Sequence, residues 1–138
     1  MLQSTLRLLK YQVEKIEFNL NENYNFQDGK IIELNQNLER NISKIDKDRF
    51  KISLKFEICP KNDDQVPFTL SISIAGIFEL ENWTSEENKT LATVNTVAIL
   101  FPFLRSLIAV VTSNANVPPY ILPVINVAAW LENVDKNE

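Results

Sequence analysis

The chain has 138 residues, 45% of them hydrophobic, and a formal net charge of −4. This length fits a single domain, residues 1–138, that can bury a sizeable core. The acidic balance argues against a nucleic-acid-binding protein, which needs a basic patch. The first ten residues lack the continuous apolar segment of a signal peptide, and the single cysteine, Cys59, cannot form an internal disulfide. We therefore expect a cytoplasmic protein.

The residue types needed for common active sites are missing from the sequence. Without histidine there is no Ser-His-Asp or Cys-His nucleophile system and no imidazole metal ligand. Cys59 alone cannot hold a metal ion. Two glycines, Gly29 and Gly76, are too few for a Gly-rich phosphate-binding loop. We expect a protein that is not an enzyme and that uses no metal and no cofactor.

Residues 6–20 predict a strand whose alternation changes phase. The apolar positions are first odd-numbered and then even-numbered: Leu9, Tyr11 and Val13, followed by Ile16, Phe18 and Leu20. A one-residue shift turns every side chain to the opposite face of a sheet. A β-bulge near Glu14-Lys15 would therefore keep both sets on the same face. The polar residues 19–29 that follow predict a loop.

Three further segments predict strands, although the first of them is ambiguous. Residues 31–45 fit a helix or a strand about equally well, and the strands on both sides favour a strand. Residues 50–58 alternate strictly between apolar and polar side chains. Residues 66–80 predict another long strand, which alternates from Phe68 to Ile74, and Gly76 within it indicates a bend or a close approach. Short polar connections between these segments predict a four-stranded antiparallel sheet with one apolar face.

The segment that follows the sheet predicts helices, which makes the fold class α+β. Thr84-Ser85-Glu86-Glu87 matches a capping box with Thr84 as the N-cap. We expect a long helix from there towards Val111, kinked or broken at Pro102, and a short closing helix over residues 123–131.

Residues 90–131 contain one charged residue, Arg105, in an otherwise apolar or small polar segment. Asn95, Pro102 and Arg105 interrupt every window long enough to span a membrane, so we expect no stable membrane insertion. A helix that is apolar on all sides must be covered on most sides. Because a chain of this size has little else to cover it, we expect an oligomer.

Four stretches of the sequence resemble the SecB family of export chaperones. Residues 99–105, ILFPFLR, resemble the family motif I-L-F-P-Y-x-R. The segment TSNANVPPYILPVINVAAWL resembles S-R-G-T-F-P-Q-L-N-L-A-P-V-N-F, with Asn126 on the family asparagine and Pro123 displaced by one position. Gly76-Ile77-Phe78 resembles G-I-F, and residues 11–18 resemble the first family strand. The match covers nearly the whole chain in order, and its most specific part is the first motif.

The resemblance implies a four-stranded antiparallel sheet of Greek-key type, a long helix and a short final helix. It makes residues 31–45 a strand by analogy, and it implies a homotetramer, a dimer of dimers with the long helices between the sheets. We accordingly expect Val94, Ala98 and Phe101 to lie between copies.

The resemblance also implies an ATP-independent chaperone that holds extended, non-native polypeptide in an apolar groove. Family aromatic positions correspond to Phe68 and Phe103, with Leu131 at a third. Four further residues would line the same groove: Leu70, Ile72, Val127 and Trp130. Tyr24 or Phe26 would take the place of a family aromatic in the first crossover loop. The clients would be preproteins or an aggregation-prone antitoxin. A binding or scaffold protein with one dedicated partner or a small apolar ligand is the alternative on this fold.

One departure from the family concerns the exposed face of the sheet. Acidic residues on this face dock the translocase motor SecA in the export chaperone, whereas the corresponding positions here are Lys15, Asn19 and Ser71. Docking of SecA by that route is therefore in doubt. A role in a toxin–antitoxin system needs no docking to the motor and is consistent with this departure.

Overall fold

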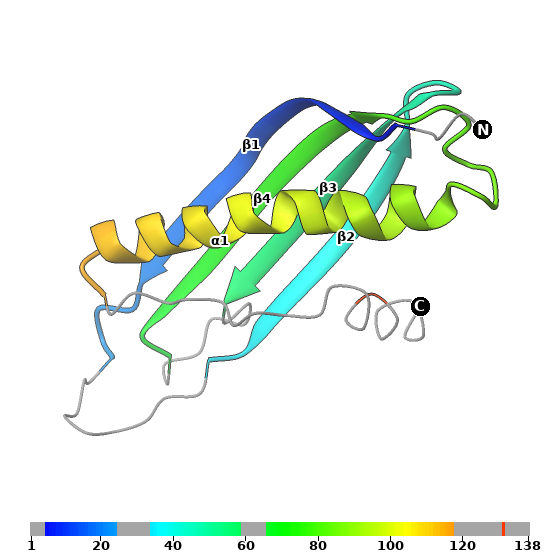
Figure 1. Ribbon diagram of the computed structural model, residues 1–138. Coiled ribbons are helices and arrows are strands. Elements are labelled where there is room, and N and C mark those ends of the chain that lie inside the picture. Colours follow the sequence, from blue (N-terminus) through cyan, green and yellow to red (C-terminus); the bar gives the residue numbers. More distant parts are fainter. Residues whose placement is uncertain (1–4, 25–33, 59–65, 118–130, 132–138) are drawn as a thin grey trace.

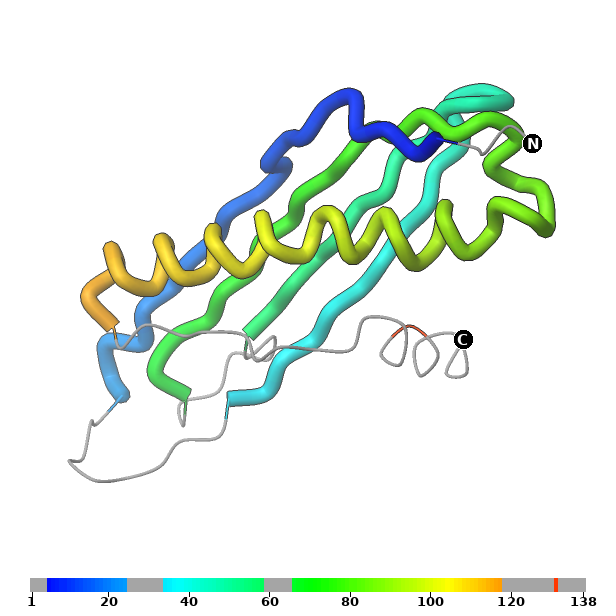
Figure 2. Tube along the Cα trace, viewed as in Figure 1, coloured from blue at the N-terminus to red at the C-terminus, as the bar shows by residue number. Residues whose placement is uncertain are grey.

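The computed structural model describes residues 5–24, 34–58, 66–117 and 131. Four strands form one antiparallel sheet: β1 (Arg7–Leu20), β2 (Gln36–Lys44), β3 (Arg49–Ile58) and β4 (Phe68–Glu79). Their order in the sheet is β1-β4-β3-β2, which is the expected Greek-key-like arrangement. A helical segment follows, with a π-helical turn η1 (Leu91–Asn95) leading into α1 (Thr96–Asn114). Figure 1 shows α1 crossing one face of the sheet obliquely, and Figure 2 shows the same path of the chain.

The predicted bulge in β1 is confirmed at the expected place. The register against β4 shifts between Val13 and Lys15, so that Val13 pairs with Ile74 and Ile16 pairs with Ile72. Both phases of the alternation therefore face the helix side of the sheet. A second shift between Leu8 and Lys10 was not predicted. It pairs Leu8 with the core residue Phe78 and leaves Leu9 without a register partner on β4, so Leu8 takes the place on the apolar face that was expected for Leu9.

The hydrophobic core lies between the sheet and the helix. It contains the alternate residues of the two central strands together with one side of α1, for example Ile52 of β3, Ile74 of β4 and Leu104 of α1. Gly76 allows a close approach between the layers. A Cβ atom there would lie 2.9 Å from Cδ2 of Leu100 on α1. The expectation of a close approach at Gly76 is therefore correct.

The helix begins later than the capping box predicts. Residues 81–88 form turns, and the first helical residue is Lys89. The buried side-chain amide of Asn88 donates a hydrogen bond to the carbonyl of Glu81 at 2.7 Å, which ties the two ends of this loop together. Thr84 is therefore not an N-cap, because the backbone groups around it serve the loop and not a helix.

The loop is also attached to the turn between β2 and β3. The indole N–H of Trp83 donates to the carbonyl of Asp46 at 3.1 Å, and its ring stacks on Phe50 with centroids 4.7 Å apart. The Asp48 carboxylate accepts the backbone N–H of Asn82 at 3.1 Å. These contacts fix the direction from which the chain enters η1.

Helix α1 continues through Pro102, so the expected kink or break at this residue is not a break in the helix. Pro102 is exposed, so the carbonyl that it leaves without an amide donor faces the outer side of the helix. By length and composition, the 24-residue helical segment Leu91–Asn114 could cross a membrane. The core helix of a soluble protein passes the same test, and one side of this helix forms the core described above. The expected closing helix lies outside the described residues, apart from Leu131.

Candidate functional site

The residues predicted to line a groove occupy different environments. The side chains of Phe68, Leu70 and Ile72 point from β4 into the core and are at most 3% exposed. Leu131 is also buried, and Tyr24 is partly buried in the turn after β1. Phe26, Val127 and Trp130 lie outside the described residues. In the single chain, the residues of β4 therefore form the base of the helix–sheet layer and offer almost no surface to a ligand.

Among the predicted groove residues that the structure describes, Phe103 is the most accessible. Its side chain is 41% exposed, and its ring stacks on Tyr11 of β1 with centroids 4.5 Å apart. Partial burial raises the pKa of the Tyr11 phenol above its ordinary value. The contact brings the outer side of α1 against the helix-facing side of the edge strand.

Exposed apolar side chains concentrate along this junction. Val13, Ile16 and Leu20 lie on the helix-facing side of β1, because their partners on β4 are core residues, yet they are 44%, 49% and 51% exposed. A matching row on α1 consists of Ile99, Phe103 and Val110, at spacings of four and seven residues that place them on one helix face. We call these six residues the α1–β1 surface.

Only part of the α1–β1 surface was predicted from the sequence. Ile99, Val110 and the three residues of β1 were assigned to the core or left without a role. Their apolar character was visible, but an α-helix with apolar residues on every side gives no indication of which side faces outward. The exposure of Val13, Ile16 and Leu20 depends on how far α1 reaches over the edge strand, which the alternation does not encode.

The three residues expected between copies have different exposures. Ala98 is exposed, Val94 is partly buried against the core, and Phe101 is 7% exposed. In the isolated chain, Ala98 is thus the most accessible of the three to a second copy. Arg105, the charged residue of α1, is partly buried and makes no hydrogen bond or ion pair with any residue that the structure describes.

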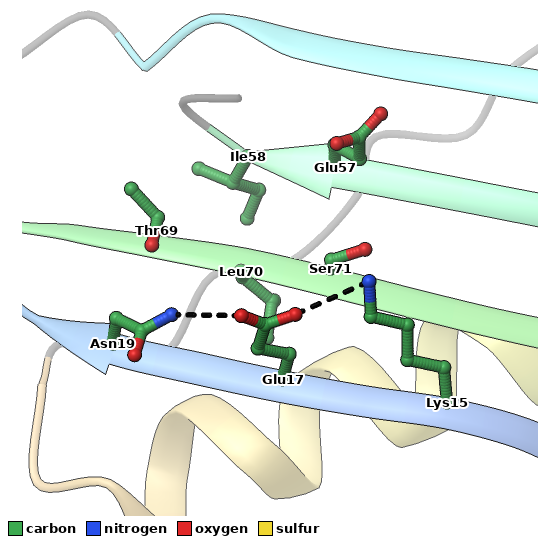
Figure 3. Close-up of a pocket in the computed structure, with 8 residues that line it drawn as sticks. All are labelled: Lys15, Glu17, Asn19, Glu57, Ile58, Thr69, Leu70 and Ser71. Carbon is green, nitrogen blue, oxygen red and sulfur yellow. Dashed lines mark hydrogen bonds and ion pairs between the residues drawn. The ribbon is translucent and has the colours of Figure 1, made fainter. Parts of the chain in front are cut away.

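The opposite face of the sheet carries a polar hollow of about 200 Å³ near the end of β1 (Figure 3). Three of its lining residues stand at the family's acidic positions: Lys15, Asn19 and Ser71. Two glutamates, Glu17 and Glu57, also line it, and the remaining lining residues are Ile58, Thr69 and Leu70. The two glutamates flank Ser71 on neighbouring strands, since Glu17 and Glu57 both pair with it in register.

The acidic groups of this hollow are balanced by neighbouring side chains. Lys15 Nζ lies 3.1 Å from a carboxylate oxygen of Glu17, and the amide of Asn19 donates to the other oxygen at 3.4 Å. The hydrogen bond from Lys15 contributes most to holding the pKa of the Glu17 carboxyl below its ordinary value, and the hydrogen bond from Asn19 contributes next. Lys55 Nζ lies 3.7 Å from Glu57 in the same way. The hollow is therefore an electrically mixed surface and not an acidic patch.

A metal centre finds no support in the part of the chain that the structure describes. No group of three or more Cys, Asp or Glu side chains lies close enough together there to hold a metal ion. The described residues thus form two surfaces of different chemistry: the apolar α1–β1 surface, and a mixed polar surface on the opposite face of the sheet.

Comparison with known proteins identifies the family. The family model described as preprotein translocase subunit SecB matches residues 3–137. An uncharacterized protein of Methanocaldococcus jannaschii is 39% identical over 134 residues, which cover 95% of this chain and 85% of that protein. The protein-export protein SecB of Acinetobacter baumannii is 32% identical over 100 residues, covering 72% of this chain and 66% of that protein. The match thus spans just under two thirds of that export protein.

Solved structures show the same fold. A SecB-like chaperone of Mycobacterium tuberculosis, solved in complex with a peptide from an antitoxin, superposes with a TM-score of 0.65 over 88% of each chain, at 15% identity. The order of strands and the single long helix across one face of the sheet agree with the fold expected from the sequence resemblance. With its family model matched from residue 3 to residue 137, the chain belongs to the SecB family.

Proposed function

We propose that this protein is an ATP-independent chaperone of the SecB type, which holds extended, non-native polypeptides. Family membership supports the chaperone role, and the relatives named above connect it with protein export and with antitoxin binding. The observation that carries the proposal is the exposed α1–β1 surface. Burial of apolar side chains is non-directional, so such a surface accepts many unrelated sequences.

The same apolar side chains also support assembly into a tetramer, a dimer of dimers. Six large apolar residues exposed around one aromatic contact form a surface of the kind that marks a protein interface. Ala98, and with it the outer side of α1, remains open for a second copy. Part of the surface is then covered by assembly. The part that stays accessible, together with the predicted residues outside the described ones, binds the client. The place of action is the cytoplasm, and no catalytic step is involved.

The mixed polar hollow bears on the choice between export and a toxin–antitoxin role. A motor that recognises acidic residues finds Lys15, Asn19 and Ser71 at the corresponding positions, and Glu17 is already paired with Lys15. This arrangement favours a client that is delivered without docking to SecA, such as an aggregation-prone antitoxin.

The proposal is tested by the variant Phe103→Asp, compared with Ser106→Asp as a matched control. Ser106 is exposed on the same helix three residues further on, so the control adds the same charge without removing an aromatic side chain. We expect Phe103→Asp to weaken binding of several unrelated denatured proteins by about 2 kcal/mol, which is roughly 30-fold, whereas Ser106→Asp has an effect below about threefold.

Calorimetry measures the client affinity, and sedimentation checks the assembly of each variant. Unchanged affinity of Phe103→Asp for every denatured protein, with the tetramer intact, would remove Phe103 from the binding site. If the parent protein bound only one ligand among many candidates, it would be a dedicated binding protein and not a general chaperone. A stable monomer at micromolar concentration would contradict the proposed tetramer.

A further inference from the structure

The start of the long helix contains one residue more than a regular α-helix would hold. Within η1, the backbone N–H of Thr96 bonds to the carbonyl of Leu91, five residues earlier, which defines a π-turn. Such turns are rare, and they are kept where the surroundings favour them. Two threonines adjust the same region, since the hydroxyl of Thr96 donates to the carbonyl of Ala92 at 2.7 Å and that of Thr93 donates to the carbonyl of Lys89 at 2.7 Å.

The extra residue changes which side of the helix Ala92 occupies. Ile99 follows Ala92 by seven residues. In a regular α-helix, seven residues correspond to a rotation of about 700° around the helix axis, which is about 20° short of two full turns. The two side chains would then share the outward face. Ala92 is nevertheless 1% exposed, whereas Ile99 is 37% exposed. One residue of extra length, equivalent to a rotation of about 100°, explains why Ala92 lies in the core.

A side chain of β2 contacts the π-turn through a hydrogen bond. Arg40 lies on β2 opposite the core residue Leu54, so its side chain starts from the helix-facing side of the sheet. One of its terminal nitrogens donates to the carbonyl of Thr93 at 2.9 Å. Neither η1 nor α1 has an acidic residue in its first turn, so side chains of the helix itself contribute little charge stabilisation there.

We infer that Arg40 is the positioning residue that locks the register of the long helix. By binding the Thr93 carbonyl inside the π-turn, the guanidinium keeps Ala92 in the core and ends the outward apolar row of α1 at Ile99. If the lock is lost, η1 becomes α-helical and Ala92 turns outward. The exposed apolar row then extends by about two turns towards the start of the helix.

The test measures the register directly, in a background in which Cys59→Ser removes the natural thiol. Ala92→Cys provides a reporter thiol, and its reaction with a maleimide is slow as long as residue 92 stays in the core. Arg40→Met should accelerate this labelling about tenfold, the effect of losing one charge-assisted hydrogen bond. Lys44→Met is the matched control, because Lys44 is an exposed cation on the same strand. Lys44→Met should leave the labelling rate unchanged. Arg40→Lys should change the labelling rate only slightly, because lysine retains a hydrogen-bond donor.

Deleting Thr93 separates a register lock from a simple packing role. The shortened helix needs no π-turn to keep residue 92 in the core, so Arg40→Met should no longer accelerate labelling in that background. If Arg40→Met alone fails to fold, deletion of Thr93 should restore folding. Slow labelling in folded Arg40→Met, or equal effects of Arg40→Met with and without Thr93, would overturn the inference. The register of α1 is independent of what binds the exposed surface, so failure of this test leaves the proposed chaperone role untouched.

Discussion

Substitution of Gly76 by alanine tests how closely the helix is docked on the sheet. An added Cβ atom would lie 2.7 Å from Cε2 of Phe78, 2.9 Å from Cδ2 of Leu100 and 3.1 Å from Cδ1 of Leu8. Phe78 and Leu100 are fully buried, so neither can move its side chain into solvent. Gly76→Ala therefore requires a shift of α1 relative to β4.

The expected destabilisation is about 1–2 kcal/mol. Overpacking of a dense core costs roughly 1–3 kcal/mol. Replacing glycine by alanine recovers about 0.4–1 kcal/mol, because the unfolded chain has less conformational freedom to lose. The steric term is larger than the entropic gain, so the net effect is a loss of stability.

Urea unfolding, followed at one fixed protein concentration because assembly contributes to stability, measures this loss as a lower midpoint with an unchanged slope. Ser73→Thr is the control, since it adds one methyl group to the opposite face of the same strand. Leu100→Val removes one of the clashing groups. The double variant Gly76→Ala, Leu100→Val should therefore be less destabilised than the sum of the single variants. If Gly76→Ala is as stable as the parent, the helix is not held at the distance described here.

Two further predictions concern the loop that directs the chain into η1. Hydrogen bonds from the Arg49 side chain and the Asp48 N–H hold the pKa of the Asp46 carboxyl below its ordinary value. The ionised carboxylate therefore stabilises the folded state above about pH 4, and this stabilisation is lost as the pH falls through the lowered pKa. The difference in urea midpoint between the parent and Asp46→Asn should accordingly shrink towards pH 2, and a difference independent of pH would contradict this. Trp83→Phe keeps the stacking on Phe50 but removes the indole N–H, and thermal or urea unfolding should show a loss of about 1 kcal/mol, whereas no loss would mean that the hydrogen bond contributes nothing.

The strands were predictable from the sequence because the signal for a half-buried strand is local. Alternation in β3 and in the first part of β4 predicts both their type and the face that each residue occupies, and the structure confirms it from Phe50 to Ile58 and from Phe68 to Ile74. The bulge at Glu14-Lys15 followed from the same rule, because only one extra residue can bring odd and even apolar positions to one face.

The start of the helix could not be predicted from local pattern. The capping box at Thr84 is a real signal, but the loop around it is held by partners distant in sequence, such as Asp48, which is bound by the backbone of Asn82. Likewise, the π-turn depends on Arg40, which precedes its acceptor Thr93 by 53 residues. A motif read along the chain contains no information about such contacts.

The sequence by itself determined that α1 is buried in part and that the sheet has one apolar face, because charge is nearly absent from the helix and alternates in the strands. Only the tertiary structure decided which apolar residues remain exposed. Phe68, Leu70 and Ile72 are buried in the core, whereas Ile16 and Leu20, equally apolar, lie on the edge strand β1 and remain about half exposed. Hydrophobicity drives burial without direction, so which apolar side chains are buried depends on how the helix lies across the sheet, and the alternation along the chain does not encode this.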